Sequence, residues 1–193
     1  DADKLTVVPG FIDAHCHPAS AGLSELLDVN CDLRTIAEIK KAIEARVARS
    51  AAGAWVFGFK FDDTKLTDKV PLTRADLDQA APKHPVRIVH RGGHTSYVNS
   101  EALRLAGVTR NTADPAGGRF GRQDKRELNG FVGEHANDVF DKVARRPEAT
   151  ARQRQAGVKL MSELMTAAGL TSVHDAMTSR DHFFAYQDAR PAD

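Results

Sequence analysis

The residues best suited to chemistry lie in the segment VVPGFIDAHCHP, residues 7–18, where an apolar run ends in an acid and two histidines. In an extended chain, residues i and i+2 point to the same side, so the imidazoles of His15 and His17 can converge on one cation. Imidazole nitrogen is a common ligand of Zn²⁺. Asp13 is placed to accept the second ring proton of a ligand histidine, and Cys16 points the opposite way, into the wall behind the site. Two surface histidines paired by chance are the alternative.

Three other apolar segments also end in histidine or aspartate. The segments AWVFGFKFD, HPVRIVH and LTSVHDA predict strands at residues 54–62, 84–90 and 170–176, because each is short and rich in β-branched or aromatic residues. The polar residues at their ends are Asp62 and Asp63, His90 and His94, and His174 and Asp175. In a parallel barrel, reactive groups sit at the rim where the strands end. These strand ends therefore predict one site built from several strands.

Clear helix signals separate the predicted strands. Thr35 with Glu38, and Thr73 with Asp76, have the spacing of a capping box, in which each side chain bonds the backbone N–H of the other residue. Glycine and proline residues then mark where the helices end. We expect helices within residues 35–50, 72–82, 100–107 and 150–169, and the start of another after residue 181.

Strands that alternate with helices imply parallel pairing and right-handed crossovers. Four such strands are about half of a closed eight-stranded barrel, which typically needs ~250 residues. We therefore expect an α/β fold, a partial (β/α)8 TIM-type barrel of about the first four β/α units, forming one domain over residues 1–193. Its first strand, FIDA at residues 11–14, is expected to be buried. Residues 109–135 contain the segment GGRFGRQDKRELNGFVGE, which alternates like a hairpin and predicts a small insertion.

The composition is that of a globular protein, with 41% hydrophobic and 27% charged residues. A formal net charge of +1 gives no electrostatic reason to expect nucleic acid or an anionic membrane as a partner, so we expect a small-molecule substrate. No apolar run approaches the ~20 residues needed to span a bilayer. The two cysteines suggest no disulfide framework, and a reducing cytoplasm is the expected compartment.

Several segments resemble a known family. VVPGFIDAHCHP resembles the first-strand signature of the amidohydrolase superfamily, whose members are metal-dependent hydrolases on a distorted (β/α)8 barrel. GHTSYVNSEAL, LTRADLDQAAPKHPV, GFVGEHA and GLTSVHDA are similar to segments of amidohydrolase family 3, whose relatives include N-substituted formamide deformylases. The resemblance runs from residue 7 to residue 176. It implies a metal-dependent hydrolase of C–N bonds, of the amide or formamide type, in small molecules.

The resemblance also implies roles for individual residues. His15 and His17 match the metal pair of the first strand, with Zn²⁺ as the expected divalent ion. Glu134 is a candidate further metal ligand, and a cap on the helix that follows it is the alternative. The candidate substrate-binding residues are His94, Asn99 and His174.

Two of these assignments carry alternatives. Asn99 matches the "GH…N" element of the family, but it is equally suited to cap the helix that begins after it. His174 and Asp175 end the fourth predicted strand at the rim, where substrate contact or support of a metal ligand is expected rather than direct binding of the ion.

The chain also departs from the family pattern. The family is expected to take further histidines from strands five and six and a catalytic aspartate from strand eight, and those strands are absent here. We therefore expect the general base outside these 193 residues, and a chain that is inactive or nearly so on its own. Hydrolysis of another ester or ring substrate stays open. So does a non-enzymatic module that binds metal or associates with itself through open sheet edges.

Overall fold

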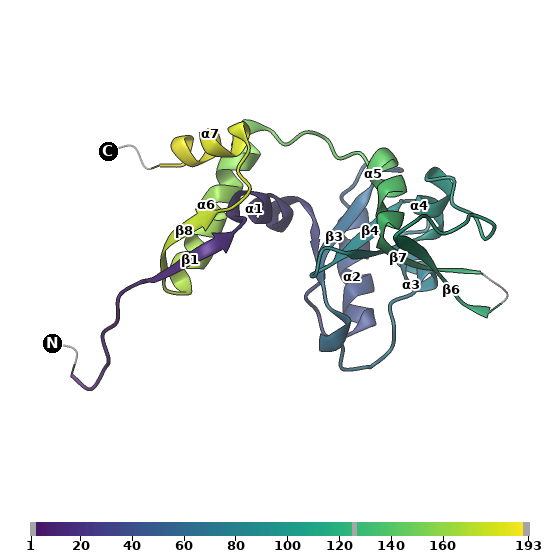
Figure 1. Cartoon of the computed structure of the whole chain (residues 1–193), viewed down its shortest axis with the longest axis horizontal. Coiled ribbons are helices and arrows are strands. Elements are labelled where there is room, and N and C mark those ends of the chain that lie inside the picture. The colour runs from purple at the N-terminus through teal and green to yellow at the C-terminus, as the bar shows by residue number, and fades with distance from the viewer. Residues whose placement is uncertain (1–2, 125–126, 191–193) are drawn as a thin grey trace. The chain divides into compact units, whose positions relative to one another are not determined.

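The structure is a computed structural model in which residues 3–124 and 127–190 are described. The chain divides into two compact units, drawn in Figure 1. The terminal unit combines both ends of the chain, residues 1–27 and 148–193, and the central unit spans residues 28–147. Each unit has its own sheet, its own helices and its own cluster of buried apolar residues.

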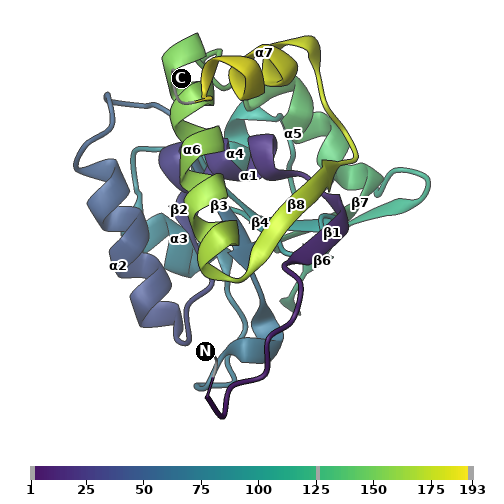
Figure 2. The ribbon, with the colours of Figure 1, turned by 90° about the vertical axis from the view of Figure 1, so that its left-hand side faces the viewer.

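The described residues of the terminal unit form two parallel strands and three helices. They are β1 (Phe11–Cys16), β8 (Leu170–Asp175), α1 (Pro18–Leu27), α6 (Ala151–Ala167) and α7 (Arg180–Asp188). Helix α6 packs against β8, α1 and α7, and Figure 2 shows it alongside β8. A Cβ atom at Gly22 of α1 would lie 2.2 Å from the carbonyl oxygen of Gly157 of α6. These two glycines therefore let the helix backbones touch.

Strand β1 differs from the buried strand that the sequence predicts. It runs from Phe11 to Cys16, and residues 5–10 form neither strand nor helix. Phe11 is 61% exposed and Ile12 is 73% exposed, on opposite faces of the strand. The prediction of burial is wrong, because among the described residues only β8 pairs with β1, and neither side chain is covered.

The central unit is built on a six-stranded sheet with the order β2-β3-β4-β5-β7-β6. Its strands are β2 (Val29–Asn30), β3 (Val56–Phe61), β4 (Val86–His90), β5 (Thr95–Val98), β6 (Gly118–Arg122) and β7 (Leu128–Glu134). The first three are parallel, as expected for strands joined by helices, whereas β5, β7 and β6 run antiparallel to their neighbours. The sequence does not predict β2, because two residues are too few to show a pattern.

The α/β class is confirmed, whereas the partial barrel stays a prediction. Of the four expected strands, the first and fourth form the two-stranded sheet of the terminal unit, and the second and third lie in the central sheet. The described strands therefore pair in two separate sheets rather than in one parallel set of four. The assignment of residues 1–193 to a single half barrel also stays a prediction.

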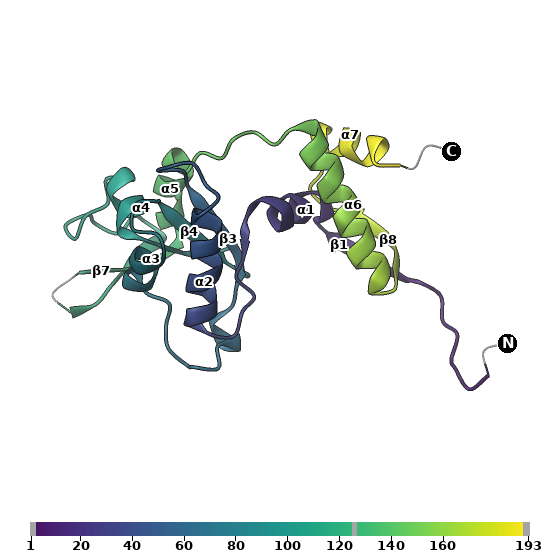
Figure 3. The same ribbon diagram turned by 180° about the vertical axis from the view of Figure 1, so that it is seen from behind.

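Helices α2 (Ile36–Val47) and α3 (Arg74–Ala80) begin at the two predicted capping boxes. The Thr35 hydroxyl oxygen accepts from the backbone N–H of Glu38 at 3.2 Å, and the Glu38 carboxylate accepts from the N–H of Thr35 at 3.0 Å. Ile39 and Ile43 bury one face of α2 against the sheet, in front of which α2 lies in Figure 3. None of the described helices has the length and apolar character needed to cross a lipid bilayer.

The remaining helices that the structure describes in the central unit are short. They are α4 (Ser100–Leu105), α5 (Asp138–Val143) and the 3₁₀ turns Asp63–Lys65 and His135–Asn137.

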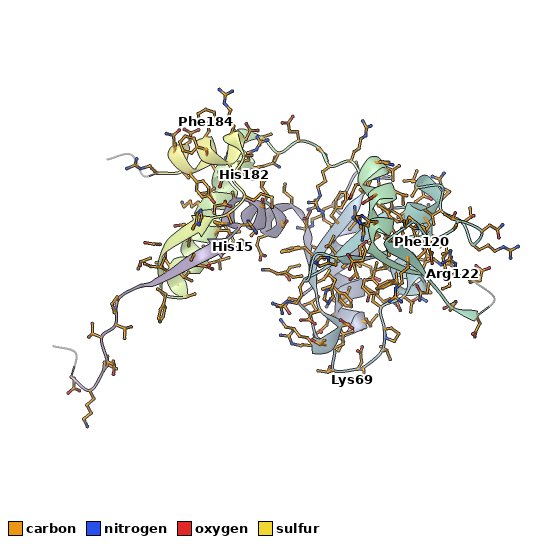
Figure 4. All side chains as sticks on the ribbon, in the orientation of Figure 1. His15, Lys69, Phe120, Arg122, His182 and Phe184 are labelled. Atoms are coloured by element: carbon orange, nitrogen blue, oxygen red, sulfur yellow. The ribbon has the colours of Figure 1, made fainter. Side chains whose placement is uncertain are left out.

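The segment predicted as a hairpin forms two antiparallel strands, β6 and β7. Because β7 also pairs with β5, the two strands continue the central sheet. Phe120, labelled on β6 in Figure 4, is buried with Leu128 and Val132 of β7 in one apolar cluster. The assignment of residues 109–135 as an insertion stays a prediction, and residues 125–126 lie outside the described part of the chain.

One edge of the central sheet collects most of the polar strand ends. Strand β5 is antiparallel to β4 and β7 is antiparallel to β5, so the ends of β3, β4 and β7 meet the start of β5. We call this edge the polar edge. It carries the candidate residues Asp62, Asp63, His90, His94 and Glu134.

Candidate active site

The two histidines of the terminal unit lie next to each other. The imidazole rings of His15 and His17 are 5.3 Å apart between centroids and stand at 80° to each other. Both side chains are exposed at the end of β1, where Figure 4 labels His15. Alternate side chains of an extended segment share a side of the strand, which accounts for this placement. Binding of a metal ion by the pair stays a prediction.

The side chains of Asp13 and Cys16 form hydrogen bonds with backbone groups of histidines and not with imidazole rings. The Asp13 carboxylate accepts from the backbone N–H of His15 at 3.0 Å, so the expected bond to a second ring proton is not what the structure shows. The Cys16 thiol donates to the carbonyl of His174 at 3.5 Å. Burial, followed by the charges of Asp13 and Asp175, raises the pKa of this thiol, so it stays protonated at neutral pH.

Asp175 places a carboxylate beside the ring of His17. Its side chain is 8% exposed, and Oδ1 lies 3.8 Å from Nδ1 of His17. Oδ2 accepts from the Tyr186 hydroxyl at 2.6 Å, and that hydroxyl in turn accepts from the backbone N–H of Ala19 at 3.1 Å. Burial opposes the charge of Asp175, but the hydrogen bonds from Tyr186 and Met177 outweigh it and lower the pKa of this carboxyl group. The histidine pair therefore has a fixed anion beside it.

Tyr186 has no role in the sequence analysis, since a tyrosine in a short terminal helix carries no distinguishing signal. His174, by contrast, is one residue before Asp175 and so lies on the opposite face of β8. Its Nδ1 is 3.2 Å from the carbonyl oxygen of Ala14 on β1, and the ring is exposed. Substrate contact by His174 stays a prediction.

At the polar edge of the central unit, the side chains of His94 and Glu134 are hydrogen bonded, with 3.1 Å between Nδ1 and Oε2. Glu134 occupies the N-cap position of the following 3₁₀ turn but makes no capping hydrogen bond with its side chain, so the alternative of a helix cap stays a prediction. Its backbone has φ 51° and ψ −130°, a conformation that residues with a side chain rarely adopt. Of the three predicted metal ligands, His15 and His17 belong to the terminal unit and Glu134 to the central unit.

Asn99 has the structural role that the sequence offered as an alternative. It is fully buried and caps α4, with its side-chain oxygen accepting from the N–H of Ala102 at 3.0 Å and of Val86 at 3.0 Å. Its amide nitrogen donates to the carbonyls of Ala81 and His84. Since all four hydrogen-bonding positions of the amide are used, Asn99 has none left for a substrate.

The polar edge also holds a candidate metal cluster. Among the described residues, Asp62, Asp63 and His90 form a group of three whose ligand atoms all lie within 4.8 Å of one another. The Asp62 carboxylate is already bonded to the hydroxyl and N–H of Thr64 and to the guanidinium of Arg91. The Thr64 hydroxyl, with Arg91 next, lowers the pKa of Asp62 to about 2. A cation at this cluster would have to compete with Arg91.

The protonation of His90 also opposes a metal ion at this cluster. Nδ1 of His90 accepts from the backbone N–H of Gly92 at 3.1 Å, so in the neutral ring the proton is on Nε2, 3.3 Å from the Asp63 carboxylate. A metal ion at Nε2 would require the proton on Nδ1, which faces the N–H donor of Gly92. The geometry therefore favours a hydrogen-bonded network, and the exposed pair His15 and His17 remains the better metal candidate.

Comparisons of the sequence with known proteins identify a family and related proteins. The model of the amidohydrolase family matches residues 1–193. N-substituted formamide deformylase of Arthrobacter pascens is 32% identical over 198 residues, which cover 100% of this chain and 36% of that protein. Exoenzymes regulatory protein AepA of Pectobacterium carotovorum subsp. carotovorum is 34% identical over 148 residues, which cover 73% of this chain and 32% of that protein.

A solved structure is also similar to this chain. The crystal structure of an uncharacterized metal-dependent hydrolase from Pyrococcus furiosus has a TM-score of 0.52 and 23% sequence identity, over 93% of this chain and 34% of that one. The likeness supports the α/β fold. The chain spans about a third of the length of these relatives. By the family match over its whole length, the chain belongs to the amidohydrolase family.

Proposed function

We propose that this chain provides the first metal-binding pair of a metal-dependent hydrolase that acts on C–N bonds of small amides or formamides. The observation that carries the proposal is the pair of adjacent, exposed imidazoles of His15 and His17, 5.3 Å apart, in a chain of the amidohydrolase family. The bond type is supported by the 32% identity to a relative named as an N-substituted formamide deformylase.

The donor groups in the terminal unit fit a divalent cation. Two imidazoles are ligands that Zn²⁺ accepts readily, and the ionised carboxylate of Asp175 lies 3.8 Å from the ring of His17. His15 and His17 would hold the ion, and Asp175 would keep the ring of His17 in place. When bound there, a divalent ion such as Zn²⁺ would lower the pKa of a water molecule to about 7 and would polarise a carbonyl group.

Among the described residues, the carboxylates of Asp175 and Asp62 do not offer an evident general base. Asp175 is bonded to Tyr186 and Met177, and Asp62 to Thr64 and Arg91, so neither carboxylate is free to take a proton. We therefore propose that the base comes from outside this chain and that the 193 residues alone have little or no activity. Glu134 keeps one carboxylate oxygen outside its bond to His94, so a role as a further metal ligand stays part of the proposal.

The test is the zinc content of the purified chain after dialysis, measured by plasma mass spectrometry, together with the dissociation constant for Zn²⁺. The double variant H15A/H17A is expected to lose the bound ion. The control is His135→Ala, which removes an exposed histidine of the central unit to which no role is assigned. A wild-type chain that binds no zinc, or an H15A/H17A chain that binds it equally well, would falsify the proposed site.

A second candidate function is self-association. It is favoured by the exposed apolar side chains of the N-terminal segment and β1, which are Leu5, Val7, Val8, Phe11 and Ile12. In the described part of the terminal unit, β1 and β8 each pair on one side only, and open strand edges promote pairing with another chain. We propose this association as a property of the chain alongside metal binding.

A further inference from the structure

Asn137 lies at the centre of a network that the proposed function does not use. Its side-chain oxygen accepts from the Ser96 hydroxyl at 2.5 Å and from the Arg87 guanidinium at 3.1 Å. Its amide nitrogen donates to the carbonyl of His94 at 3.2 Å and to the carbonyl of Glu134 at 3.1 Å. One side chain therefore holds the backbone of both members of the His94–Glu134 pair.

This network surrounds a strained residue. The φ of 51° and ψ of −130° at Glu134 belong to a region that glycine occupies without cost and other residues rarely enter. Such a conformation persists when neighbouring contacts fix it. Here the N–H of Glu134 donates to the carbonyl of His94 at 2.8 Å, and its own carbonyl is held by Asn137. Strain of this kind is concentrated at functional sites, which favours a functional role for the His94–Glu134 pair.

The pair fixes the protonation of the His94 ring. The Glu134 carboxylate can only accept, so Nδ1 of His94, 3.1 Å away, must carry the proton. In the neutral ring the lone pair is then on Nε2. The His94 side chain is 75% exposed, and among the described residues Nε2 has no hydrogen-bond partner. The ring therefore offers a hydrogen-bond acceptor to the surface.

We infer that Asn137 is a positioning residue, which holds the His94–Glu134 pair so that Nε2 of His94 accepts a hydrogen bond from a substrate. The matching donor is an amide N–H, which formamides and amides with one nitrogen substituent carry. The choice of substrate rests on the proposed function. The position of the proton on the His94 ring does not depend on the proposed function, because it can be measured without metal and without substrate.

The test is ¹⁵N NMR of the histidine rings in the whole chain at about pH 8.5, where an ordinary imidazole with a pKa of about 6.5 is neutral. His94 is expected as a single tautomer with the proton on Nδ1. The variant Asn137→Asp keeps an acceptor for Ser96 and Arg87 but cannot donate to the two carbonyls, so His94 is expected to show both tautomers. Glu134→Ala removes the acceptor and is expected to give the same result.

The matched control is Asn129→Ala, which removes an asparagine of β7 whose side chain, among the described residues, accepts from the N–H of Phe131 two residues away. This variant should leave the His94 signals unchanged. Scalar couplings across the hydrogen bonds from the Asn137 amide to the carbonyls of His94 and Glu134 test the same contacts in the wild-type chain, even if Asn137→Asp does not fold. Absence of these couplings, a proton on Nε2 in the wild type, or unchanged His94 signals in a folded Asn137→Asp chain would overturn the inference. Loss of zinc binding by H15A/H17A bears only on the metal site.

Discussion

At the scale of single residues, hydrogen bonds from Thr64 and Arg91 stabilise the charged form of the Asp62 carboxylate. The Thr64 hydroxyl and then Arg91 lower the pKa of Asp62 from 3.8 to about 2. Because the folded-state pKa is below the unfolded value, Asp62 contributes stability that is complete above about pH 4 and is lost as the pH falls toward 2. We expect the free energy of unfolding of Asp62→Asn to fall less over this range than that of the wild type.

The measurement is urea unfolding of the two chains at about pH 4.5 and about pH 2.5, where the unfolded carboxyl group is ionised and protonated, respectively. The informative quantity is the difference between the two chains at each pH, because other carboxylates titrate equally in both. Parallel changes in the wild type and in Asp62→Asn would show that the contacts of Asp62 do not stabilise its charge.

The backbone of Glu134 gives a second prediction at this scale. At φ 51° and ψ −130°, we expect Glu134→Gly to be more stable than Glu134→Ala by about 1 kcal/mol, since only alanine retains the strain. Both variants lose the bond to His94, so that loss cancels. Asp138 has helical backbone angles, with φ −59° and ψ −30°. At this position we expect Asp138→Ala to be more stable than Asp138→Gly by about 1 kcal/mol, because alanine is the better helix former.

Urea unfolding followed by the fluorescence of Trp55 measures these differences, because this single tryptophan packs against the core of the central unit. Equal stability of the two Glu134 variants would mean that the strain is relaxed in solution. If the glycine variant were the more stable one at both Glu134 and Asp138, or the alanine variant at both, then the backbone conformation would not decide which variant is more stable.

Residue contacts separate into those that local spacing predicts and those that it cannot. His15 and His17 are two residues apart, so the period of an extended chain is enough to bring their rings together. His94 and Glu134 are forty residues apart, and they meet only because β5 and β7 are neighbours in the sheet. The contact of Tyr186 with Asp175 likewise depends on where α7 packs. Hence the contact between His15 and His17 was predictable, whereas the contacts of Glu134 and Tyr186 were not.

At the scale of elements, the touching backbones of α1 and α6 give the next prediction. Alanine normally stabilises a helix by about 1 kcal/mol relative to glycine. At Gly22, however, the new Cβ would lie 2.2 Å from the carbonyl oxygen of Gly157, and backbone atoms cannot rotate away. Overpacking of this kind costs about 1–3 kcal/mol. We therefore expect Gly22→Ala to destabilise the terminal unit by about 1–2 kcal/mol.

Hydrogen exchange of the α1 and α6 amides reports this loss within the terminal unit. Ser20→Ala, an exposed change on the same helix, is the control and should leave exchange unchanged or slower. Slower exchange in Gly22→Ala would show that α1 moves away from α6 without cost and that close contact of the helices is not required.

Element boundaries were predictable wherever a local signal exists. Threonine at a cap, with a carboxylate three residues later, located the starts of α2 and α3, and alternation located the strands β6 and β7. The pairing of strands was not predictable in the same way. Strand β7 lies beside β5, and β1 pairs with β8 across more than 150 residues, because partner choice depends on non-local packing.

At the scale of the whole molecule, strand β1 combines apolar residues with an exposed position. Phe11 and Ile12 are residues of a buried strand, but both are largely exposed, on opposite faces. The chain spans about a third of the length of its relatives, so those proteins contain much polypeptide that has no counterpart here. In the described part of the chain, β1 pairs along one edge only, and Phe11 and Ile12 are exposed on its two faces, so β1 is the strand through which we expect this chain to associate with other molecules.

For the chain itself, the expected consequence is association that grows with concentration. Ile12→Lys puts a charge on the open strand, which natural edge strands use to prevent pairing, so we expect it to lower the average mass measured by sedimentation velocity at high concentration. Val70→Lys is the matched control, because it adds the same charge at an exposed apolar residue of a central-unit loop. A wild-type chain that stays monomeric would show that the open strand does not drive association. An equal reduction in both variants would show that net charge, rather than the open strand, governs association. A reduction confined to Ile12→Lys would instead show that the exposed apolar residues of β1 are buried against a second copy of the chain.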